Sequence, residues 1–396
     1  VTKKISMKKN ILILFLLSVS CAFAQTQSYR FSKDIEHEIL QDTLKHIGHR
    51  SQLGATALSI SGYHKRAIQA WDLYFGRTKV LKASDSLTLK TYQTHPAKKY
   101  IIDQAKKSNI TLINEAHHNA QHRAFATSLL TDLYQNGYRY IGIEALDNLA
   151  NFTDNKFATT ASGYYTSEPE FATFIRKALA LGFTLFAYES EGNGPDREQG
   201  QAENIKKYMQ NNTQGKYLLY VGYEHAFEGI HETWQKAMVQ RLKELINEDV
   251  FTVDQVQFLE QSTPQFTHPY VAYFDPKEPV VLSDEFDKIV GVKRKEAYTD
   301  VSVMHPFTKY NHNKPNWLLG YGNKKWYKVP TKKLKHFPQL FLVYREGEAR
   351  ENGIPVEVVE AISTHDSVMF LLEPGRYEVV VKNAKNEEVS RFDIKM

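Results

Sequence analysis

The sequence predicts an α/β fold in which a mostly parallel sheet is covered by helices on both faces. Short apolar runs alternate with helix-period segments between about residues 99 and 330, which is typical of consecutive strand–helix units. Residues 30–95 show helical periodicity and no strand pattern, whereas the last sixty or so residues show only alternating strand runs. We therefore expect an N-terminal helical cap and a small C-terminal β-sandwich.

Length and composition are those of a folded globular chain. The 396 residues are 42% hydrophobic and include 22 Phe, 23 Tyr and 4 Trp, which excludes a disordered, collagen-like or coiled-coil protein. The formal net charge is +5, but four lysines lie in residues 1–24, so the remaining 46 basic groups nearly balance the 45 acidic ones. A near-neutral body offers no electrostatic surface for nucleic acid or an anionic membrane, and we expect neither as a partner.

The N-terminus has the order of features of a secretory signal peptide. Two lysines precede an apolar run at residues 11–19, and small residues follow up to Ala24. The run is too short to span a membrane. The only cysteine, Cys21, lies inside this segment, where Ser18 is a poor match to a lipoprotein signal, so cleavage after Ala24 is favoured over lipidation. The mature chain is then exported, periplasmic or secreted, with no disulfide and no transmembrane segment.

The central segment contains strand and helix signals in regular alternation. Each strand is a short apolar run suited to a buried parallel strand, and the helices have one apolar face and stop signals such as Gly137 and Gly182. Residues 167–170 have capping-box spacing and open one of the helices. The predicted strands are residues 110–113, 140–143, 183–188, 217–221, 253–258 and 300–304, and the predicted helices run through Phe125 and Leu133, through Phe171 and Leu179, over 197–209, and through Trp234 and Leu245.

The flanking segments differ in kind from this central one. A turn at residues 62–67 joins two helical segments that end near Trp71 and Tyr74, which indicates a helical hairpin, loosely similar to one tetratricopeptide unit, acting as a cap. The C-terminal strand runs are split by turn residues at 373–375 and suggest a structural or adhesive unit. These runs are residues 338–344, 355–361, 367–372 and 376–381. The predicted segments are therefore a signal peptide (1–24), a helical region (25–98), an α/β domain (99–330) and a β-sandwich domain (338–396).

Acidic side chains and histidines follow the predicted strands at the point where each strand ends. In an open parallel sheet the carboxyl ends of the strands meet at one edge, where ligands bind. Buried unpaired carboxylates are costly, so a cluster of this kind normally pairs with cations, with a metal or with histidines. In strand order, these residues are Glu115, His117 and His118, then Glu144, Glu189, His225 and His305.

Part of this cluster also has a purely structural explanation. Glu144 and Glu189 can cap helices or pair with Arg197. His122 can cap or pack within its helix, and His305 can simply end its strand before a proline. We expect a functional role for the first and fourth strand ends, because histidines at two strand ends of one sheet are not a packing pattern.

Residues 114–122 resemble the early motif of the superfamily that joins erythromycin esterases, ChaN-type haem-uptake proteins and Tiki/TraB proteases. ChaN-like members have a Glu-x-His-x-Asn-x-x-His pattern, which is matched position by position by Glu115, His117, Asn119 and His122. Glu115 and His118 match the Glu-x-x-His of erythromycin esterases. Residues 197–205 are similar to the family's Arg-led helix, and residues 217–225 to its second hallmark, a strand that leads into Gly-x-x-His.

The resemblance covers about residues 100–320 and implies one of three chemistries. The family usually has glycine before the motif glutamate, where this chain has Asn114. In an esterase-like site one histidine is the general base for a water, a glutamate orients it, and no serine nucleophile is needed; the chain has no Gly-x-Ser-x-Gly motif. In a Tiki-like site a divalent zinc, manganese or cobalt ion activates the water, and its ligands are Glu115, His117 and His225. In a ChaN-like site haem binds through an axial Tyr or His, and the candidate tyrosines are Tyr164, Tyr165 and Tyr223.

From these observations we predict an exported hydrolase of this type that cleaves an ester or a peptide, with a small molecule or peptide as its substrate. Glu115 and His118 (or His117) act together with His225, and the remaining charged groups shape the field around them. Those groups are Glu144, Glu189 and Arg197. The alternative is a haem- or metal-binding uptake protein of the ChaN type without catalysis, in which Tyr223 contacts the cofactor.

Overall fold

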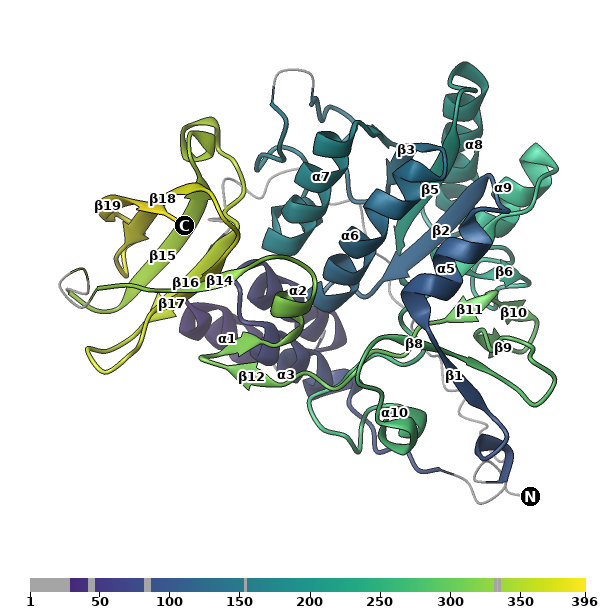
Figure 1. Cartoon of the computed structure of the whole chain (residues 1–396), viewed down its shortest axis with the longest axis horizontal. Coiled ribbons are helices and arrows are strands. Elements are labelled where there is room, and N and C mark those ends of the chain that lie inside the picture. Colours follow the sequence, from purple (N-terminus) through teal and green to yellow (C-terminus); the bar gives the residue numbers. More distant parts are fainter. Residues whose placement is uncertain (1–28, 42–46, 82–86, 153–154, 331–332, 334–335) are drawn as a thin grey trace, which may run out of the picture.

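A computed structural model describes residues 29–41, 47–81, 87–152, 155–330, 333 and 336–396 (Figure 1). The predicted signal peptide lies outside these residues. Within the described ranges, no helix combines the length and apolar character needed to cross a bilayer.

Helices and strands follow one another in the order of the predicted segments. The helices of the described residues are α1 (Ser32–Gln41), α2 (Ile47–Ile60), α3 (His64–Phe75), α5 (Ala97–Ala105), α6 (Ala120–Gln135), α7 (Pro169–Leu181), α8 (Pro195–Asn211), α9 (Met238–Ile246), α10 (Pro269–Phe274) and α11 (Trp317–Gly320), with 3-10 turns η1 (Tyr165–Ser167), η2 (Tyr223–Ala226) and η4 (Glu348–Glu351). The strands are β1 (Gln93–Pro96), β2 (Ile110–Glu115), β3 (Tyr138–Ile143), β4 (Thr184–Ala187), β5 (Lys216–Gly222), β6 (Glu228–Gly229), β7 (Phe251–Asp254), β8 (Val280–Ser283), β9 (Lys293–Arg294), β10 (Ala297–Tyr298), β11 (Val301–Ser302), β12 (Tyr310–Asn311), β13 (Lys314–Pro315), β14 (Lys325–Lys328), β15 (Gln339–Arg345), β16 (Glu357–Ala361), β17 (Met369–Leu372), β18 (Arg376–Lys382) and β19 (Glu388–Lys395).

Six of these strands form the central sheet, in the order β11-β7-β2-β5-β3-β4. Every neighbouring pair is parallel, which confirms the predicted parallel sheet. Strand β2 is buried along its whole length and lies between β7 and β5, so its end stands near the middle of the carboxyl edge. The register of this central pair places Glu115 beside Gly222.

Helices cover both faces of the sheet, as predicted (Figure 1). One face carries Ile113 and Ile143 and packs against α5, α6 and α7. The other face carries Leu112 and Leu219 and packs against α8 and α9. Because successive residues of a strand point to opposite faces, a strand buried on both sides is apolar throughout, which explains the uninterrupted apolar runs in the sequence.

The N-terminal region contains the three helices α1 to α3, which share a small core around Ile35, Leu58 and Ala67. The last turns of α3 bring Trp71 to the carboxyl edge of the sheet, where its ring stacks on His118. The prediction of an entirely helical segment at residues 30–95 is wrong at its end, where β1 pairs antiparallel with β8. This short strand has no apolar alternation, and its pairing depends on hydrogen bonds to a distant part of the chain.

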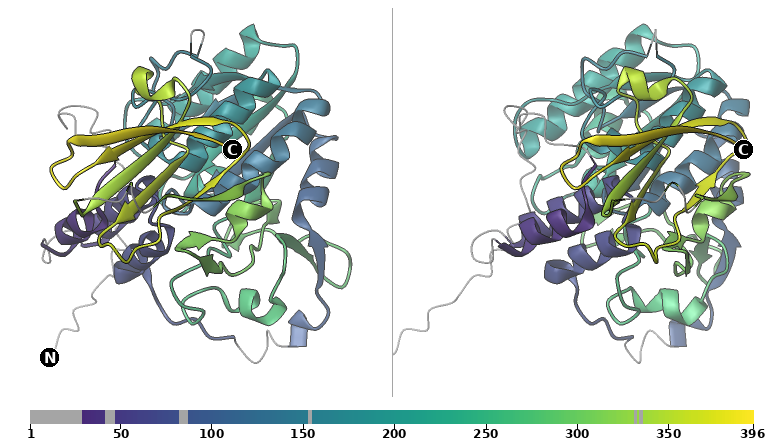
Figure 2. Two further views of the ribbon diagram at one scale, coloured as in Figure 1. Left: turned by 60° about the vertical axis from the view of Figure 1, so that its left-hand side comes forward. Right: turned by 90° about the vertical axis from the view of Figure 1, so that its left-hand side faces the viewer.

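The C-terminal residues form a four-stranded antiparallel sheet, β16-β15-β18-β19, and a two-stranded sheet, β14-β17, with a shared core that includes Phe341 and Phe370. The opposite face of the larger sheet packs on the α/β unit through Leu340 and Val380. Figure 2 shows these strands lying across one side of the molecule. Strand β14 precedes the predicted boundary at residue 338, and β19 was not predicted because most of its side chains are exposed and polar.

Several predicted elements are present with shifted ends. Strand β7 stops at Asp254, because the Asp254 carboxylate accepts a hydrogen bond from the backbone of Gln257 and turns the chain there. Strand β11 is limited to two residues. Helix α9 begins at Met238, so Trp234 lies in the preceding turn, where it stacks on His231 at 4.4 Å between ring centroids.

Candidate active site

The carboxyl ends of the central strands bring most of the predicted site residues together. Glu115 ends β2, Glu144 follows β3, and His225 lies in η2 directly after β5. Helix α8, which begins shortly after β4, supplies Arg197. The edge contains two hydrogen-bonded networks, one around Glu115 and one around Arg197, which meet at Gly222.

The Glu115 network is a buried ion pair with a histidine attached to it. Arg123 of α6 donates to both carboxylate oxygens, through Nε to Oε2 at 2.7 Å and through Nη2 to Oε1 at 2.5 Å. The Tyr220 hydroxyl donates to Oε2 at 2.8 Å, and Nδ1 of His117 lies 2.9 Å from Oε1. Glu115 is 1% exposed and Arg123 is fully buried, so this pair is shielded from water.

These contacts decide which nitrogen of His117 carries the proton. Burial favours a neutral Glu115, but the Arg123 guanidinium and the hydrogen bonds from Arg123 and His117 hold the pKa of Glu115 well below its ordinary value. An ionised carboxylate only accepts hydrogen bonds, so Nδ1 of His117 donates to it, and Nε2 of the neutral ring has the free lone pair. The side-chain hydrogen bond of His117 to a described residue runs through Nδ1, to Glu115. His117 is therefore oriented as a base.

The space for His117 comes from Gly222. A Cβ at this position would lie 2.6 Å from His117 Nε2 and 3.3 Å from Glu144 Oε2. The backbone of Gly222 is extended, with φ −88°, so glycine is required here for close approach and not for its conformational freedom. Its N–H donates to Glu144 Oε2 at 2.6 Å. Nε2 of His117 thus lies beside Gly222, and the N–H of Gly222 binds Glu144 of the Arg197 network.

Arg197 is the centre of the second network. Its Nη2 donates to Glu144 Oε1 at 2.8 Å and to Glu189 Oε2 at 2.5 Å, and its Nε donates to Glu189 Oε1 at 2.9 Å. Burial would raise the pKa of Glu144, but His225 and Arg197 hold this pKa well below its ordinary value. The side chain of Arg197 is 14% exposed and that of Glu189 is 32% exposed. This network, unlike the first, reaches solvent.

His225 lies between two carboxylates. Its Nδ1 is 2.9 Å from Glu198 Oε2, and its Nε2 is 3.2 Å from Glu144 Oε1. Burial alone would lower the pKa of His225, but the two carboxylates raise it to about 10. His225 is therefore an imidazolium at neutral pH. Arg197 Nη1 lies 3.1 Å from the same Nε2, and because a guanidinium only donates, Nε2 accepts this bond only when it carries no proton. The carboxylates of Glu144 and Glu198 favour the protonated ring instead.

His118 faces a different direction from its neighbour His117. Its ring stacks on Trp71 at 4.2 Å, and its Nδ1 lies 3.2 Å from the Tyr223 hydroxyl. Burial, with a further contribution from His117, lowers the pKa of His118 to about 3. The structure thus brings Glu115 together with His117 and not with His118.

The side chain of Asn114 joins the ends of β2, β5 and β7 by hydrogen bonds. Its Nδ2 donates to the Tyr223 carbonyl at 2.8 Å and to Asp254 Oδ1 at 2.7 Å, and its Oδ1 accepts from the Gln255 backbone at 2.7 Å. Tyr223 has a φ of 41°, in the left-handed region that non-glycine residues rarely adopt. The side chain of Asn114 therefore helps to hold a strained residue beside the site.

The remaining motif residues brace the turn between β2 and α6. Asn119 is the N-cap of α6 and accepts a hydrogen bond from the Gln121 backbone at 3.1 Å. His122 Nδ1 accepts from the Ala116 backbone at 3.0 Å, and its ring stacks on His305 at 5.4 Å. Both His122 and His305 thus occupy structural positions and do not bond Glu115.

The residues predicted to hold a metal do not fit that role. In the described part of the chain, no group of three or more His, Cys, Asp or Glu side chains is arranged to hold a metal ion. Glu115 binds the guanidinium of Arg123 through both oxygens, and His225 contacts carboxylates through both ring nitrogens. A divalent ion at Glu115 would lie against a cation that is itself fully buried.

The predicted haem ligand does not fit its role either. Tyrosine binds haem iron as a phenolate. Burial, together with the nearby Tyr165 and Glu115, raises the pKa of Tyr223 well above its ordinary value, which disfavours the phenolate. The hydroxyl of Tyr223 is also engaged by His118. Of the other candidate tyrosines, Tyr165 stacks on His117 at 3.9 Å and Tyr164 is exposed beside it.

Comparisons with known proteins place this chain near no named family. No family model and no curated protein matches it. Similar solved structures include the type III effector HopBA1 (8% identity, TM-score 0.36, over 55% of this chain and 98% of that one) and the MARTX toxin effector domain RRSP from Vibrio vulnificus CMCP6 (16%, 0.29, 55% and 48%). The C-terminal region of Pasteurella multocida toxin is another (9%, 0.28, 84% and 51%). At these values the similarity supports no conclusion about function.

Three residues of the two networks were not predicted from the sequence, namely Arg123, Glu198 and Tyr220. Each has a recognisable signal. Arg123 is a charged residue on the apolar face of α6, and Glu198 is an acidic residue next to Arg197 in the first turn of α8. Tyr220 lies in the buried part of β5, where a hydroxyl requires a partner.

Proposed function

We propose that this chain is a hydrolase in which His117 activates a water molecule for attack on an ester or peptide carbonyl. The observation that carries this proposal is the pair formed by Glu115 and His117. Glu115 is held as a carboxylate and bonds Nδ1, so the lone pair of Nε2 is available to accept a proton. This is the carboxylate–histidine arrangement of a general base.

The proposed reaction needs no covalent intermediate. Nε2 of His117 takes a proton from the water while the water oxygen bonds to the carbonyl carbon, and the carbonyl oxygen becomes an oxyanion. When the oxyanion collapses, the bond to the leaving alcohol or amine breaks, and that group takes the proton back from the His117 imidazolium. Glu115 keeps its charge throughout and stabilises the imidazolium.

The second network supports the developing negative charge. Arg197 and the imidazolium of His225 are positive groups set in the sheet edge, and the partly exposed Arg197 guanidinium is the one that an oxyanion can approach. The carboxylates of Glu144, Glu189 and Glu198 outnumber these two cations. Because the edge has no excess positive charge, it suits a neutral ester or amide better than a phosphate ester.

Aromatic side chains surround the proposed base. Tyr165 stacks on His117, Tyr223 meets it edge-on at 5.1 Å, and Trp71 stacks on Tyr223 at 5.8 Å. All three are partly exposed. We infer that the substrate carries an apolar or aromatic group next to the carbonyl.

The motif at residues 115–122 supports the same class of activity, because its members in this chain either form the Glu115–His117 pair or brace the turn that presents it.

Export also belongs to the proposal. The N-terminal pattern predicts that the protein recovered outside the cytoplasm begins at Gln25, which intact mass measurement checks. A recovered protein that retains residues 1–24 would contradict export by cleavage.

Two adjacent histidines provide a matched test of the mechanism. His117→Gln removes the proposed base, whereas His118→Gln alters an equally buried neighbour that contacts Trp71 and not Glu115. Hydrolysis is measured with p-nitrophenyl acetate, p-nitrophenyl butyrate and a fluorogenic peptide library, and a thermal melt of each variant checks folding. We expect His117→Gln to lower kcat by about a hundredfold or more, and His118→Gln to keep kcat within about threefold of the wild type.

Two results would refute the proposal. One is a folded His117→Gln variant with unchanged kcat. The other is a wild-type protein that hydrolyses neither the esters nor any peptide.

A further inference from the structure

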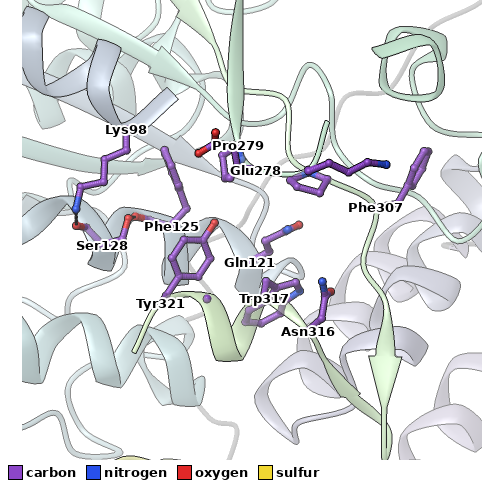
Figure 3. A pocket seen from close by; sticks show the side chains of 13 residues that line it. Lys98, Gln121, Phe125, Ser128, Glu278, Pro279, Phe307, Asn316, Trp317 and Tyr321 are labelled. Carbon is purple, nitrogen blue, oxygen red and sulfur yellow. Dashed lines mark hydrogen bonds between the residues drawn. The ribbon is translucent and has the colours of Figure 1, made fainter. Parts of the chain in front are cut away.

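Two cavities of the described chain lie outside the Glu115 network. The first, of about 360 Å³, lies beside α6, with Phe125 and Tyr321 at one end and Phe307 at the other (Figure 3). The buried Oε1 of Gln121 has no surface open to this cavity. The second, of about 400 Å³, lies beside the end of β4 and adjoins the Arg197 network through Glu189. Its walls are the ones that indicate a ligand.

One wall of the second cavity is a face of α8, and the other is formed by the chain after β3 and at the end of β4. The lining residues of α8 recur at intervals of three or four, which places them on one side of the helix. The volume lies within the range of small-molecule sites. The polar residues considered below are four asparagines, a lysine and a tyrosine, namely Asn148, Asn204, Asn211, Asn212, Lys207 and Tyr208.

Three of these asparagines are held by hydrogen bonds from their amide nitrogens. Nδ2 of Asn204 donates to the backbone carbonyls of Tyr188 and Glu189, at 3.2 and 3.1 Å. Nδ2 of Asn211 and that of Asn212 each donate to a backbone carbonyl one helical turn earlier, at 3.0 and 2.9 Å. Because these bonds run through nitrogen, the oxygen of each amide is the atom that can accept a hydrogen bond from a ligand.

The charges at the second cavity favour neither a cationic nor an anionic ligand. Lys207 and Glu189 are the charged residues that line it, one of each sign. Glu189 is paired with Arg197, and Glu203 lies one helical turn before Lys207 on α8. A neutral ligand that donates several hydrogen bonds therefore suits this cavity best.

A ligand with several hydroxyl groups matches these side chains. Each hydroxyl group both donates and accepts, so a sugar ring can donate to the asparagine oxygens and accept from Nζ of Lys207. The ring of Tyr208 is held by stacking on Phe186, at 3.8 Å between ring centroids, and provides apolar surface for the C–H groups of a sugar. An extended peptide fits less well, because the backbone carbonyls that follow β4 are already bonded to Asn204.

We propose that the second cavity binds a neutral glycan through one or two of its sugar rings. Hydroxyl groups of the sugar donate to the Oδ1 atoms of Asn204, Asn211 and Asn212, Lys207 donates to the sugar oxygens, and Tyr208 packs against the sugar ring. This binding does not depend on the proposed hydrolysis, so its test succeeds or fails independently of the proposed function.

Neutral disaccharides test the proposal directly. Saturation-transfer NMR of the full chain with maltose, cellobiose, lactose, mannobiose and diacetylchitobiose identifies those that bind, and isothermal titration calorimetry gives their Kd. Glucuronate and a blocked tetra-alanine peptide represent an anionic ligand and a peptide. We expect at least one disaccharide to bind with a Kd of about 1 mM or lower, and about tenfold or more tightly than glucuronate or the peptide. Lys207→Met and Asn211→Ala are each expected to weaken this binding by about three- to tenfold.

Gln210→Ala is the matched control, because Gln210 is an exposed amide residue next to Asn211 on α8 that does not line the cavity. This variant is expected to bind the disaccharide as tightly as the wild type. Lys207 and Asn211 are exposed, so their substitution leaves the core intact. Three results would overturn the proposal: no binding of any disaccharide, tighter binding of glucuronate or the peptide, and disaccharide binding that neither Lys207→Met nor Asn211→Ala weakens more than Gln210→Ala does.

Discussion

The substitution Glu115→Gln removes the charge that faces Arg123 in the interior of the proposed site. Arg123 is fully buried, and its other acidic partner is Glu168, whose Oε2 lies 3.2 Å from Nη1. Burial raises the pKa of Glu168 to about 7, so this carboxyl is only partly ionised near neutral pH. Arg123 would therefore lose most of its counter-charge.

The cost of this loss follows from the contacts. Removing one partner of a buried ion pair costs about 3–5 kcal/mol, because the other charge stays buried and uncompensated. The glutamine amide adds to this cost, because four donor hydrogen bonds converge on the two oxygens of Glu115 and one side of the new amide is itself a donor. We expect the free energy of unfolding to fall by about 3–5 kcal/mol and turnover to be lost.

Urea denaturation, followed by tryptophan fluorescence and by far-UV circular dichroism, measures this change. The double substitution Glu115→Gln with Arg123→Met removes both charges and is expected to recover about 2 kcal/mol or more of the lost stability without restoring turnover. A single substitution that costs less than about 1 kcal/mol, or a double variant no more stable than the single one, would refute the buried-pair argument.

Three further predictions concern other parts of the sheet edge. Gly222→Ala is expected to displace His117 and lower kcat by about tenfold or more at a stability cost of about 1–3 kcal/mol, and an unchanged kcat beside a normal thermal melt would contradict the close-approach argument. The raised pKa of His225, about 10, means that its charge stabilises the fold fully below about pH 6.5 and that this contribution is lost as the pH rises toward 10. The difference in unfolding free energy between wild type and His225→Gln should therefore shrink over that range, and a difference that does not change with pH would count against the imidazolium. Asn114→Gly removes hydrogen bonds to Tyr223 and Asp254 and is expected to cost about 2–4 kcal/mol in urea denaturation; a cost near zero would show that Asn114 does not hold the strand ends.

The fold class could be predicted because its signals are local. Apolar runs such as residues 110–113 are strands buried on both faces, and the glycine at 182 ends a helix in the left-handed conformation, with φ 95°. Strands with weak local signals were missed for the same reason. The short β1 depends on pairing with β8, and the largely exposed β19 depends on pairing with β18.

The sequence by itself also determined where the chemistry collects. Each strand of the α/β unit ends at a definite residue, and parallel strands share one carboxyl edge, so Glu115, Glu144 and His225 had to lie near one another. It did not determine which histidine serves Glu115. Residues 117 and 118 are adjacent in a turn, and the direction of each ring depends on what lies beside it.

Only the tertiary structure decided the pairing and the protonation of these groups. His117 turns toward Glu115 because Gly222 leaves room for its ring, and His118 turns toward Trp71 of a helix that packs from the N-terminal region. The charge states follow from distances of about 3 Å between side chains on different elements. No local sequence pattern encodes these distances, because the electrostatic energy of a buried charge depends on which neighbours the fold places beside it.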